Sequence, residues 1–212
     1  MSASIGNVEG VTWKTAWESV TFRIKIITGG VVLVAILSFF PFFFTHIEER
    51  TGVVLNDFIL KAIPARDLST PIFIIIWGVS VLTFYKSIRK PGVLLLFLWS
   101  FIFLSLSRIL TISIVALNPP IGLIPLVDPL SNTFYGGGFI TKDLFYSGHT
   151  ATQFLMFLCL QSQPYKLLAL LSTVAVGMMV LIQHVHYTID VITAPLFTYI
   201  VFRLAQVFVG KV

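Results

Sequence analysis

The chain has 212 residues, of which 57% are hydrophobic and 11% are charged, and its mean hydropathy is +0.95. This composition is too apolar for a soluble domain of that size and predicts one integral membrane domain over residues 1–212. The net charge of +5 does not indicate nucleic-acid binding, because the basic residues flank apolar segments instead of forming one patch. A single cysteine, Cys159, excludes a disulfide within the chain.

The apolar segments predict an all-α fold, an integral membrane six-helix bundle over residues 26–209 that follows an N-terminal segment, residues 1–25. The fourth segment is shorter than the roughly 20 residues that a span normally needs. The first is long enough to span and is not followed by a cleavage site, so we expect no cleaved signal peptide. The six predicted spans are Ile26–Phe44, Ser69–Tyr85, Gly92–Leu117, His149–Leu160, Leu167–Gln183 and Ile189–Phe208.

Lysine and arginine predict the orientation, because they are enriched in cytoplasmic loops. With a cytoplasmic N-terminus, the larger basic set falls inside: Lys14, Arg23, Lys25, Lys86, Arg89, Lys90, Lys166, Arg203 and Lys211. The smaller set falls outside: Arg50, Lys61, Arg66 and Lys142. We therefore expect both termini in the cytoplasm, in a bacterial inner membrane or a eukaryotic endomembrane or plasma membrane.

The two outer loops, at about residues 45–68 and 118–148, have different characters. The first mixes charged and apolar residues, and its middle could form a short amphipathic helix in the membrane interface. The second is rich in proline and glycine, so we expect no regular helix there.

The stretch "HVHYTID", residues 184–190, places two histidines and an aspartate between two apolar segments. If residues from 185 onward are helical, His186 and Asp190 share a face and can touch. A carboxylate that accepts a proton from one imidazole nitrogen leaves the other free to act as a nucleophile or base. His184 would point to a different face, and could form the wall of a site, support a catalytic residue or equally be a catalyst itself.

A second motif, "FYSGHTAT", lies where the second outer loop becomes a span. Ser147 can cap the start of the helix, whose free amides would form an anion site, and Gly148 would allow close approach of a ligand. His149 then projects from the first turn. Both motifs fall on the outer side, and two histidines beside an anion site suit phosphoryl transfer, in which one attacks phosphorus and the other protonates the leaving oxygen.

Arg108 lies within the third predicted span, where an unpaired charge is costly. It could form a structural ion pair with Asp143 or Asp190, or bind phosphate oxygens. Asp143 could also serve as a helix N-terminal acid or contact a substrate headgroup. Lys142 is a further candidate to bind phosphate.

Zinc is the competing interpretation of His149, His184, His186 and Asp190. Two histidines separated by two positions diverge on a helix, unlike the i, i+4 pair of a metallohydrolase helix. We therefore expect no metal and no other cofactor.

These motifs resemble the type 2 phosphatidic acid phosphatase superfamily, and within it the sphingomyelin synthase-like branch. The similarity rests on "DLFYSGHT" and "HVHYTID", and extends more loosely from about residue 50 to 200 through "LNDFILKAIPARDLS" and "RILTISIVALNPP". The resemblance implies that His186 is a nucleophile forming a phosphohistidine, that Asp190 orients it, and that His149 acts as acid and then base.

The chain departs from the ordinary phosphatases of the superfamily in its cations. Met179 and Val180 occupy the positions of an expected Ser-Arg pair, and a Lys-x6-Arg-Pro signature is not found. Fewer cations suit a phosphodiester monoanion better than a phosphomonoester dianion, although Arg108, Lys142 or Arg66 could supply the missing charge.

We therefore expect a membrane phosphotransferase or phosphohydrolase whose site lies at the outer face, and whose partners are a phospholipid and a water or lipid hydroxyl acceptor. The first alternative is a lipid phosphate monoesterase such as a phosphatidic acid phosphatase. The second is a non-catalytic membrane protein that reuses the fold.

Overall fold

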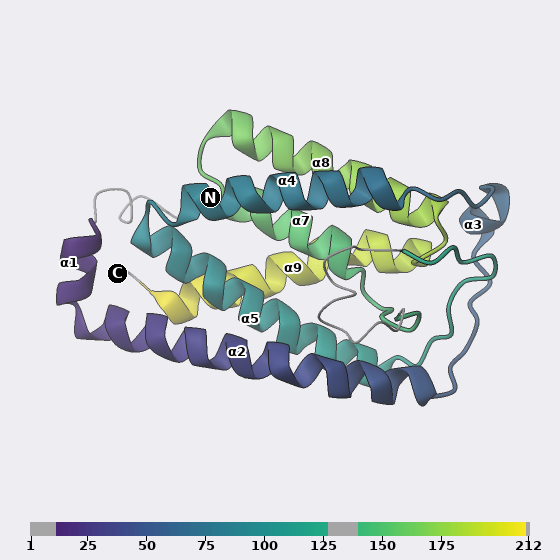
Figure 1. Cartoon of the computed structure of the whole chain (residues 1–212), viewed down its shortest axis with the longest axis horizontal. Coiled ribbons are helices and arrows are strands. Elements are labelled where there is room, and N and C mark those ends of the chain that lie inside the picture. Colours follow the sequence, from purple (N-terminus) through teal and green to yellow (C-terminus); the bar gives the residue numbers. More distant parts are fainter. Residues whose placement is uncertain (1–11, 127–139, 211–212) are drawn as a thin grey trace.

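The computed structural model describes residues 12–126 and 140–210. These residues form an all-helical bundle without a β-strand, and a single isolated bridge joins Val53 to Leu117 (Figure 1). The helices are α1 (Trp13–Glu18), α2 (Val20–Glu49), α3 (Phe58–Ala62), α4 (Ser69–Ser87), α5 (Pro91–Ile114), α7 (Gly148–Cys159), α8 (Gln163–Ile182) and α9 (Thr188–Val209).

Five of the described helices, α2, α4, α5, α8 and α9, are long and apolar enough to cross a membrane. They agree with five of the six predicted spans. The fourth predicted span corresponds to α7, which has 12 residues, so the count of six spans stays a prediction. The short helix expected in the first outer loop is α3. We expected no regular helix in the second outer loop, and this expectation falls partly on residues 127–139, outside the described residues.

Helix α7 lies in the middle of the bundle, packed against α4, α5, α8 and α9 (Figure 1). Ala151 and Leu155 on α7 are fully buried and share a cluster with Leu104 of α5 and Ala194 of α9. A helix enclosed in this way cannot shift without disturbing four neighbours, which fixes where its first turn lies.

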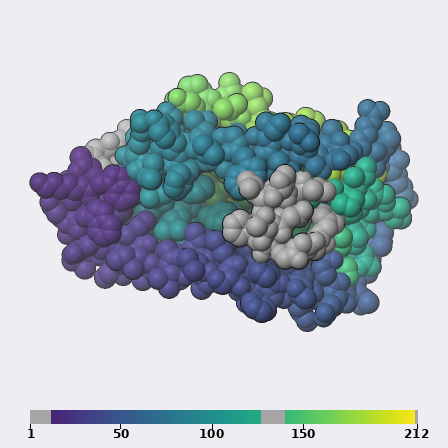
Figure 2. Space-filling view, in the orientation of Figure 1, coloured from purple at the N-terminus to yellow at the C-terminus, as the bar shows by residue number. Residues whose placement is uncertain are grey.

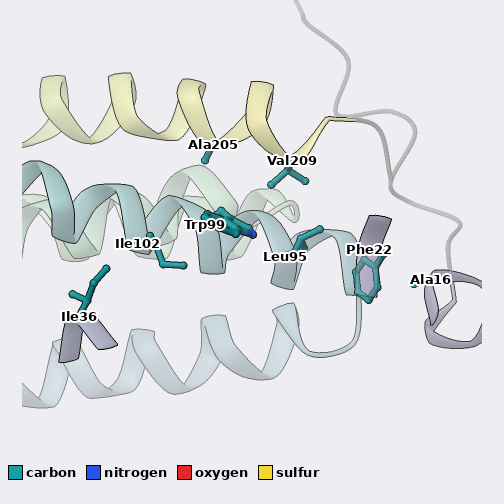
Figure 3. Close-up of a cluster of buried hydrophobic side chains, with 8 residues drawn as sticks. All are labelled: Ala16, Phe22, Ile36, Leu95, Trp99, Ile102, Ala205 and Val209. Atoms are coloured by element: carbon teal, nitrogen blue, oxygen red, sulfur yellow. The ribbon is translucent and has the colours of Figure 1, made fainter. Parts of the chain in front are cut away.

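A second apolar cluster closes the end of the bundle at which α1, the start of α2 and the end of α9 meet (Figure 3). The indole of Trp99 lies within it and donates to the carbonyl oxygen of Lys25 at 3.1 Å. Gly29 of α2 makes room for α5, since a Cβ there would lie 2.8 Å from Cδ2 of Leu98. Small residues that admit close backbone approach are typical of helix contacts in membranes.

Large apolar side chains cover much of the outside of the bundle. Val31 and Phe42 of α2, Val81 of α4, Leu171 of α8 and Val207 of α9 are all exposed. Figure 2 shows α2 along the lower edge of one face of the molecule, with α4 and α5 above it. Such a surface suits lipid, because the side chains that face outward are apolar and the backbone polar groups of a spanning helix are bonded mainly within the helix.

Candidate active site

Helices α7 and α9 begin side by side at the end of the bundle opposite the Trp99 cluster (Figure 1). The amide of Ser147 donates to the carbonyl oxygen of Asp190 at 3.0 Å, so a main-chain hydrogen bond joins the two helix starts. Ser147 is the N-cap of α7, and its Oγ accepts from the amide of Thr150 at 3.4 Å. The two polar motifs, distant in sequence, are thereby held together.

His186 and Asp190 are in contact, although the helix expected to align them does not include His186. Helix α9 begins at Thr188, with Tyr187 as its N-cap, so the condition of a helix from residue 185 is not met, although the start agrees with the span predicted from Ile189. Nδ1 of His186 lies 3.4 Å from Oδ2 of Asp190 and makes no hydrogen bond within the described residues, whereas that oxygen accepts from the amide of Tyr187 at 3.0 Å. His186 is 2% exposed and Asp190 is 0% exposed, and the carboxylate holds the ring from behind.

His149 faces His186 from the first turn of α7, with 6.0 Å between the ring centroids. Both side chains line a cavity of about 280 Å³. Its apolar lining comes from α2, α4 and α5 and includes Phe40, Phe44, Phe73, Ile76, Phe101 and Leu104. Two imidazoles thus meet at the polar end of a largely apolar chamber.

Arg108 reaches this cavity from α5 and forms an ion pair with Asp143. Its Nε donates to the carbonyl oxygen of Tyr146 at 3.3 Å. Gly148 makes room for the guanidinium, because a Cβ there would lie 2.2 Å from Nη1 of Arg108. The cation is therefore positioned over the first turn of α7, next to His149.

Four of the predicted site residues do not line the cavity: Ser147, Asp190, Lys142 and His184. Nζ of Lys142 donates to the carbonyl oxygens of Glu48 and Arg50, at the end of α2. The ring nitrogens of His184 lie 3.0 Å from the carbonyl oxygen of Ile121 and 2.9 Å from that of Ile63. His184 therefore connects the two loops, and this placement favours its supporting role over a catalytic one.

This placement also separates the ligands that zinc would need. His184 faces backbone carbonyl oxygens while His149 and His186 face the cavity. Within residues 12–126 and 140–210, no group of three or more His, Cys, Asp or Glu side chains is placed to hold a metal ion.

Residues 142–207 match the family model described as PAP2 superfamily C-terminal. The match supports the type 2 phosphatidic acid phosphatase superfamily. The match suggests lipid phosphate phosphatase or phosphotransferase activity, and together with the five apolar helices it suggests a multi-pass membrane protein. No curated protein matches the chain.

The part that matches the family model contains both histidine motifs. In the motif "HVHYTID", Tyr187 and Thr188 also make contacts that hold the site together. The hydroxyl of Tyr187 donates to the carbonyl oxygen of Asn118 at 2.8 Å and accepts from the amide of Leu55 at 3.2 Å. Thr188 donates to Asp57 through its amide and its hydroxyl. The residues around His186 therefore tie both outer loops to the start of α9.

Asp57 is a supporting residue that the sequence analysis missed. It caps α3 by accepting from the amides of Ile59 and Leu60, and it accepts from Thr188 at the start of α9. Burial raises the pKa of this carboxyl, but the hydrogen bonds outweigh burial and the pKa lies below its usual value. The "ND" before a short apolar run is a capping signal, but nothing local indicates the contact with Thr188.

Gln183 and Glu48 were also missed. Gln183 is fully buried at the end of α8; its Oε1 accepts from the amide of Leu68, and its Nε2 donates to Oγ of Ser69. The carboxylate of Glu48 accepts from the amides of Thr141 and Lys142. A polar residue at the end of an apolar segment was the available signal for Gln183.

Proposed function

We propose that the protein transfers or hydrolyses the headgroup phosphate ester of a membrane phospholipid through a phosphohistidine on His186. The observation that carries this proposal is the pairing of His149 and His186 across one cavity, with Asp190 buried behind His186. The superfamily match supports the same general chemistry. The residues that we assign to phosphate binding are Arg108, Ser147 and Gly148.

In the first step His186 attacks phosphorus. Because Nδ1 faces Asp190, Nε2 is the nitrogen available to form the new bond. The bond from phosphorus to the leaving oxygen breaks, its electron pair goes to that oxygen, and protonated His149 supplies the proton. The negative charge of Asp190 stabilises the imidazole ring as it becomes positive.

In the second step the acceptor, which is water or a lipid hydroxyl, attacks the phosphorus atom bound to His186. Neutral His149 removes the proton of the acceptor, the nitrogen–phosphorus bond breaks, and its electron pair returns to Nε2 of His186. Both histidines regain their starting protonation states. In this proposal the guanidinium of Arg108, which lines the cavity, and the positive end of the α7 dipole stabilise the phosphoryl oxygens.

The balance of charge around the cavity favours a phosphodiester. Among the described lining residues, the cation Arg108 is already paired with the carboxylate of Asp143. Lys142 points to backbone carbonyl oxygens, Arg66 is not part of the lining, and residues 127–139 contain no lysine, arginine or histidine. One partly neutralised arginine suits a monoanion better than a dianion.

The apolar lining fits a lipid substrate, because aromatic and aliphatic side chains of α2, α4 and α5 lie next to the histidines. Neither a metal nor another cofactor takes part in these steps. The orientation inferred from the basic residues puts the cavity at the outer face of the membrane.

The decisive experiment traps the intermediate on purified full-length protein. The enzyme is mixed with a choline or ethanolamine phospholipid and quenched in alkali, in which phosphohistidine survives, and the digested peptides are analysed by mass. We expect the phosphoalcohol on the peptide that contains His186 and none in His186→Gln. Turnover of phospholipid with an unmodified His186 at every time point would overturn the proposal.

The superfamily match gives weight to one alternative, a lipid phosphate monoesterase. Assays on phosphatidic acid and phosphatidylcholine in parallel separate the two functions. Our proposal expects diacylglycerol and a headgroup product from the diester, whereas phosphate release from phosphatidic acid alone would contradict the diester preference. Wild-type turnover of every lipid that does not exceed the turnover by His186→Gln would favour a non-catalytic protein.

A further inference from the structure

A second cavity, of about 150 Å³, lies at the opposite end of the bundle from the two histidines. It is formed where α4 and α7 end and α8 begins, and it shares no residue with the first cavity. The lining contains lysine side chains and no carboxylate. Its polar lining residues are Lys86, Ser87, Lys90, Gln161, Ser162 and Tyr165.

Two buried hydrogen-bond groups of this lining lack a partner. Ser87 is 1% exposed, and its Oγ makes no hydrogen bond within the described residues. The same is true of the buried Nε2 of Gln161. A buried polar group without a partner is costly, and in a native protein it usually marks a site that something else fills.

The two lysines are held at this cavity by contacts with its other lining residues. Nζ of Lys90 donates to Oε1 of Gln161, which leaves the amide donor Nε2 as the unpartnered end of that side chain. Nζ of Lys86 lies 4.2 Å from the ring centroid of Tyr165. The cavity therefore combines two cations with a hydroxyl and an amide N–H that can donate.

The start of α8 adds to this positive character. Its N-cap, Ser162, makes no side-chain hydrogen bond to the first turn, and that residue also lines the cavity. The uncapped amides at a helix N-terminus carry partial positive charge and favour an anion. The two lysines, the neutral hydrogen-bond donors and the start of α8 all favour binding of an anion.

We propose that this cavity is a second anion site, which binds a phosphate group far from the candidate active site. The phosphate could belong to free phosphate or to the headgroup of an anionic phospholipid. In the orientation inferred from the basic residues, the site faces the cytoplasmic leaflet. A water molecule could satisfy Ser87 and Gln161, but it would give the lysines no counter-charge.

The test measures binding to full-length protein and three variants. Inorganic phosphate is titrated in neutral detergent with the unfolding temperature as the readout, and the same proteins are placed in nanodiscs of phosphatidylcholine with or without phosphatidylglycerol. Ser87→Ala removes an unpartnered hydroxyl and Lys86→Gln removes one cation. Arg89→Gln is the matched control, because Arg89 is exposed, bonds to Tyr85 and does not line the cavity.

We expect both Ser87→Ala and Lys86→Gln to weaken binding about tenfold or more, the effect typical of losing a hydrogen bond to a charged group, and Arg89→Gln to behave as the wild type. If the two variants bind phosphate more weakly than the wild type in detergent, free phosphate is sufficient to fill the site. If they differ from the wild type only in nanodiscs that contain phosphatidylglycerol, the site binds a lipid headgroup. Equal behaviour of all four proteins in both formats would overturn the proposal. Equal weakening by Arg89→Gln and Lys86→Gln would also overturn it, because diffuse surface charge would then explain the binding. Phosphate bound at the first cavity does not confuse the result, since none of the three substitutions touches that cavity.

Discussion

His149 and His186 occupy different surroundings, and this difference matches the different roles that we propose for them. His186 is buried against Asp190, whereas His149 is half-buried and projects from a helix start. The first environment holds one nitrogen in place for attack, and the second leaves the ring able to exchange protons. The two roles can be separated by experiment.

The first prediction uses a leaving group that needs no proton. On a phospholipid, we expect His149→Gln to lower kcat/KM by roughly 10²–10⁴-fold, the usual contribution of a general acid. On a nitrophenyl phosphodiester that variant should recover most of its rate of intermediate formation, measured as the nitrophenolate burst. His186→Gln should fail on both substrates, and an equal loss in the two variants on both substrates would contradict the assignment.

The second prediction concerns Asp190. In Asp190→Asn an amide oxygen can still accept from the amide of Tyr187, so the start of α9 should persist while the charge behind His186 is lost. We expect kcat to fall about 10–100-fold, because the carboxylate charge that stabilises the positive imidazole of the intermediate is lost, with little change in unfolding temperature. A large fall in unfolding temperature would instead show that Asp190 acts mainly in folding.

The third prediction concerns the glycine next to His149. Gly148→Ala should displace the guanidinium of Arg108, because the added Cβ would overlap Nη1. We expect a raised KM and a lowered kcat/KM in steady-state assays. The matched control is Gly78→Ala in α4, where a Cβ meets nothing within 4 Å; it should keep wild-type kinetics, and equal loss in the two variants would contradict the proposed role of Gly148.

At the scale of elements, the start of α9 holds both outer loops. Thr188 bonds to Asp57 of the first loop, and Tyr187 bonds to Asn118 of the second. Gly52 allows the two loops to meet, since a Cβ there would lie 2.4 Å from the carbonyl carbon of Leu117. The position of His186 therefore depends on loop contacts as well as on helix packing.

The fourth prediction follows from the lowered pKa of Asp57. A carboxyl whose pKa is lower in the folded state stabilises the protein above its usual pKa of 3.8, and that stability is lost as the pH falls through the lowered value. Asp57→Asn should therefore unfold at a lower temperature than the wild type near neutral pH, and the difference should shrink below about pH 4.

The matched control for that experiment is Asp67→Asn. Asp67 is exposed and accepts from the amide and the hydroxyl of Ser69, so its loss should leave activity unchanged, whereas Asp57→Asn should reduce activity. A gap between Asp57→Asn and wild type that is constant across pH would show that the charge of Asp57 does not stabilise the contact.

The sequence predicts the long helices well because hydrophobicity and length are local properties of the chain. It also predicts that His186 meets Asp190, although the contact spans the N-cap of α9 instead of one helix face. The sequence does not predict the direction of His184, because its partners Ile121 and Ile63 lie far away along the chain. The sequence does not predict the contact between Asp57 and Thr188 for the same reason.

At the scale of the whole molecule, the two ends of the bundle have distinct chemistry. One end carries the two histidines, and the other carries α1, the Trp99 cluster and the lysine-lined cavity. The excess of basic residues at the second end predicts that it faces the cytoplasm.

The fifth prediction tests this orientation with one label at each end. In a Cys159→Ala background, a single cysteine replaces exposed Lys61 in α3 or exposed Lys14 in α1. A maleimide that cannot cross the membrane should label intact cells or sealed vesicles of native orientation at position 61 and not at position 14. The reverse pattern would place the histidines at the cytoplasmic face.

The main-chain hydrogen bond from Ser147 to Asp190 has a consequence for how such an enzyme can be redesigned. No side-chain substitution other than proline at position 147 deletes that bond, and it fixes the spacing of the starts of α7 and α9, near which the two histidines lie. Phe40, Phe73 and Phe101, which surround the reacting groups, come from three other helices. If the proposed function holds, exchanging these aromatic side chains should alter the shape of the chamber and so retarget the protein to a new headgroup or acceptor, while the geometry of His149 and His186 is inherited intact.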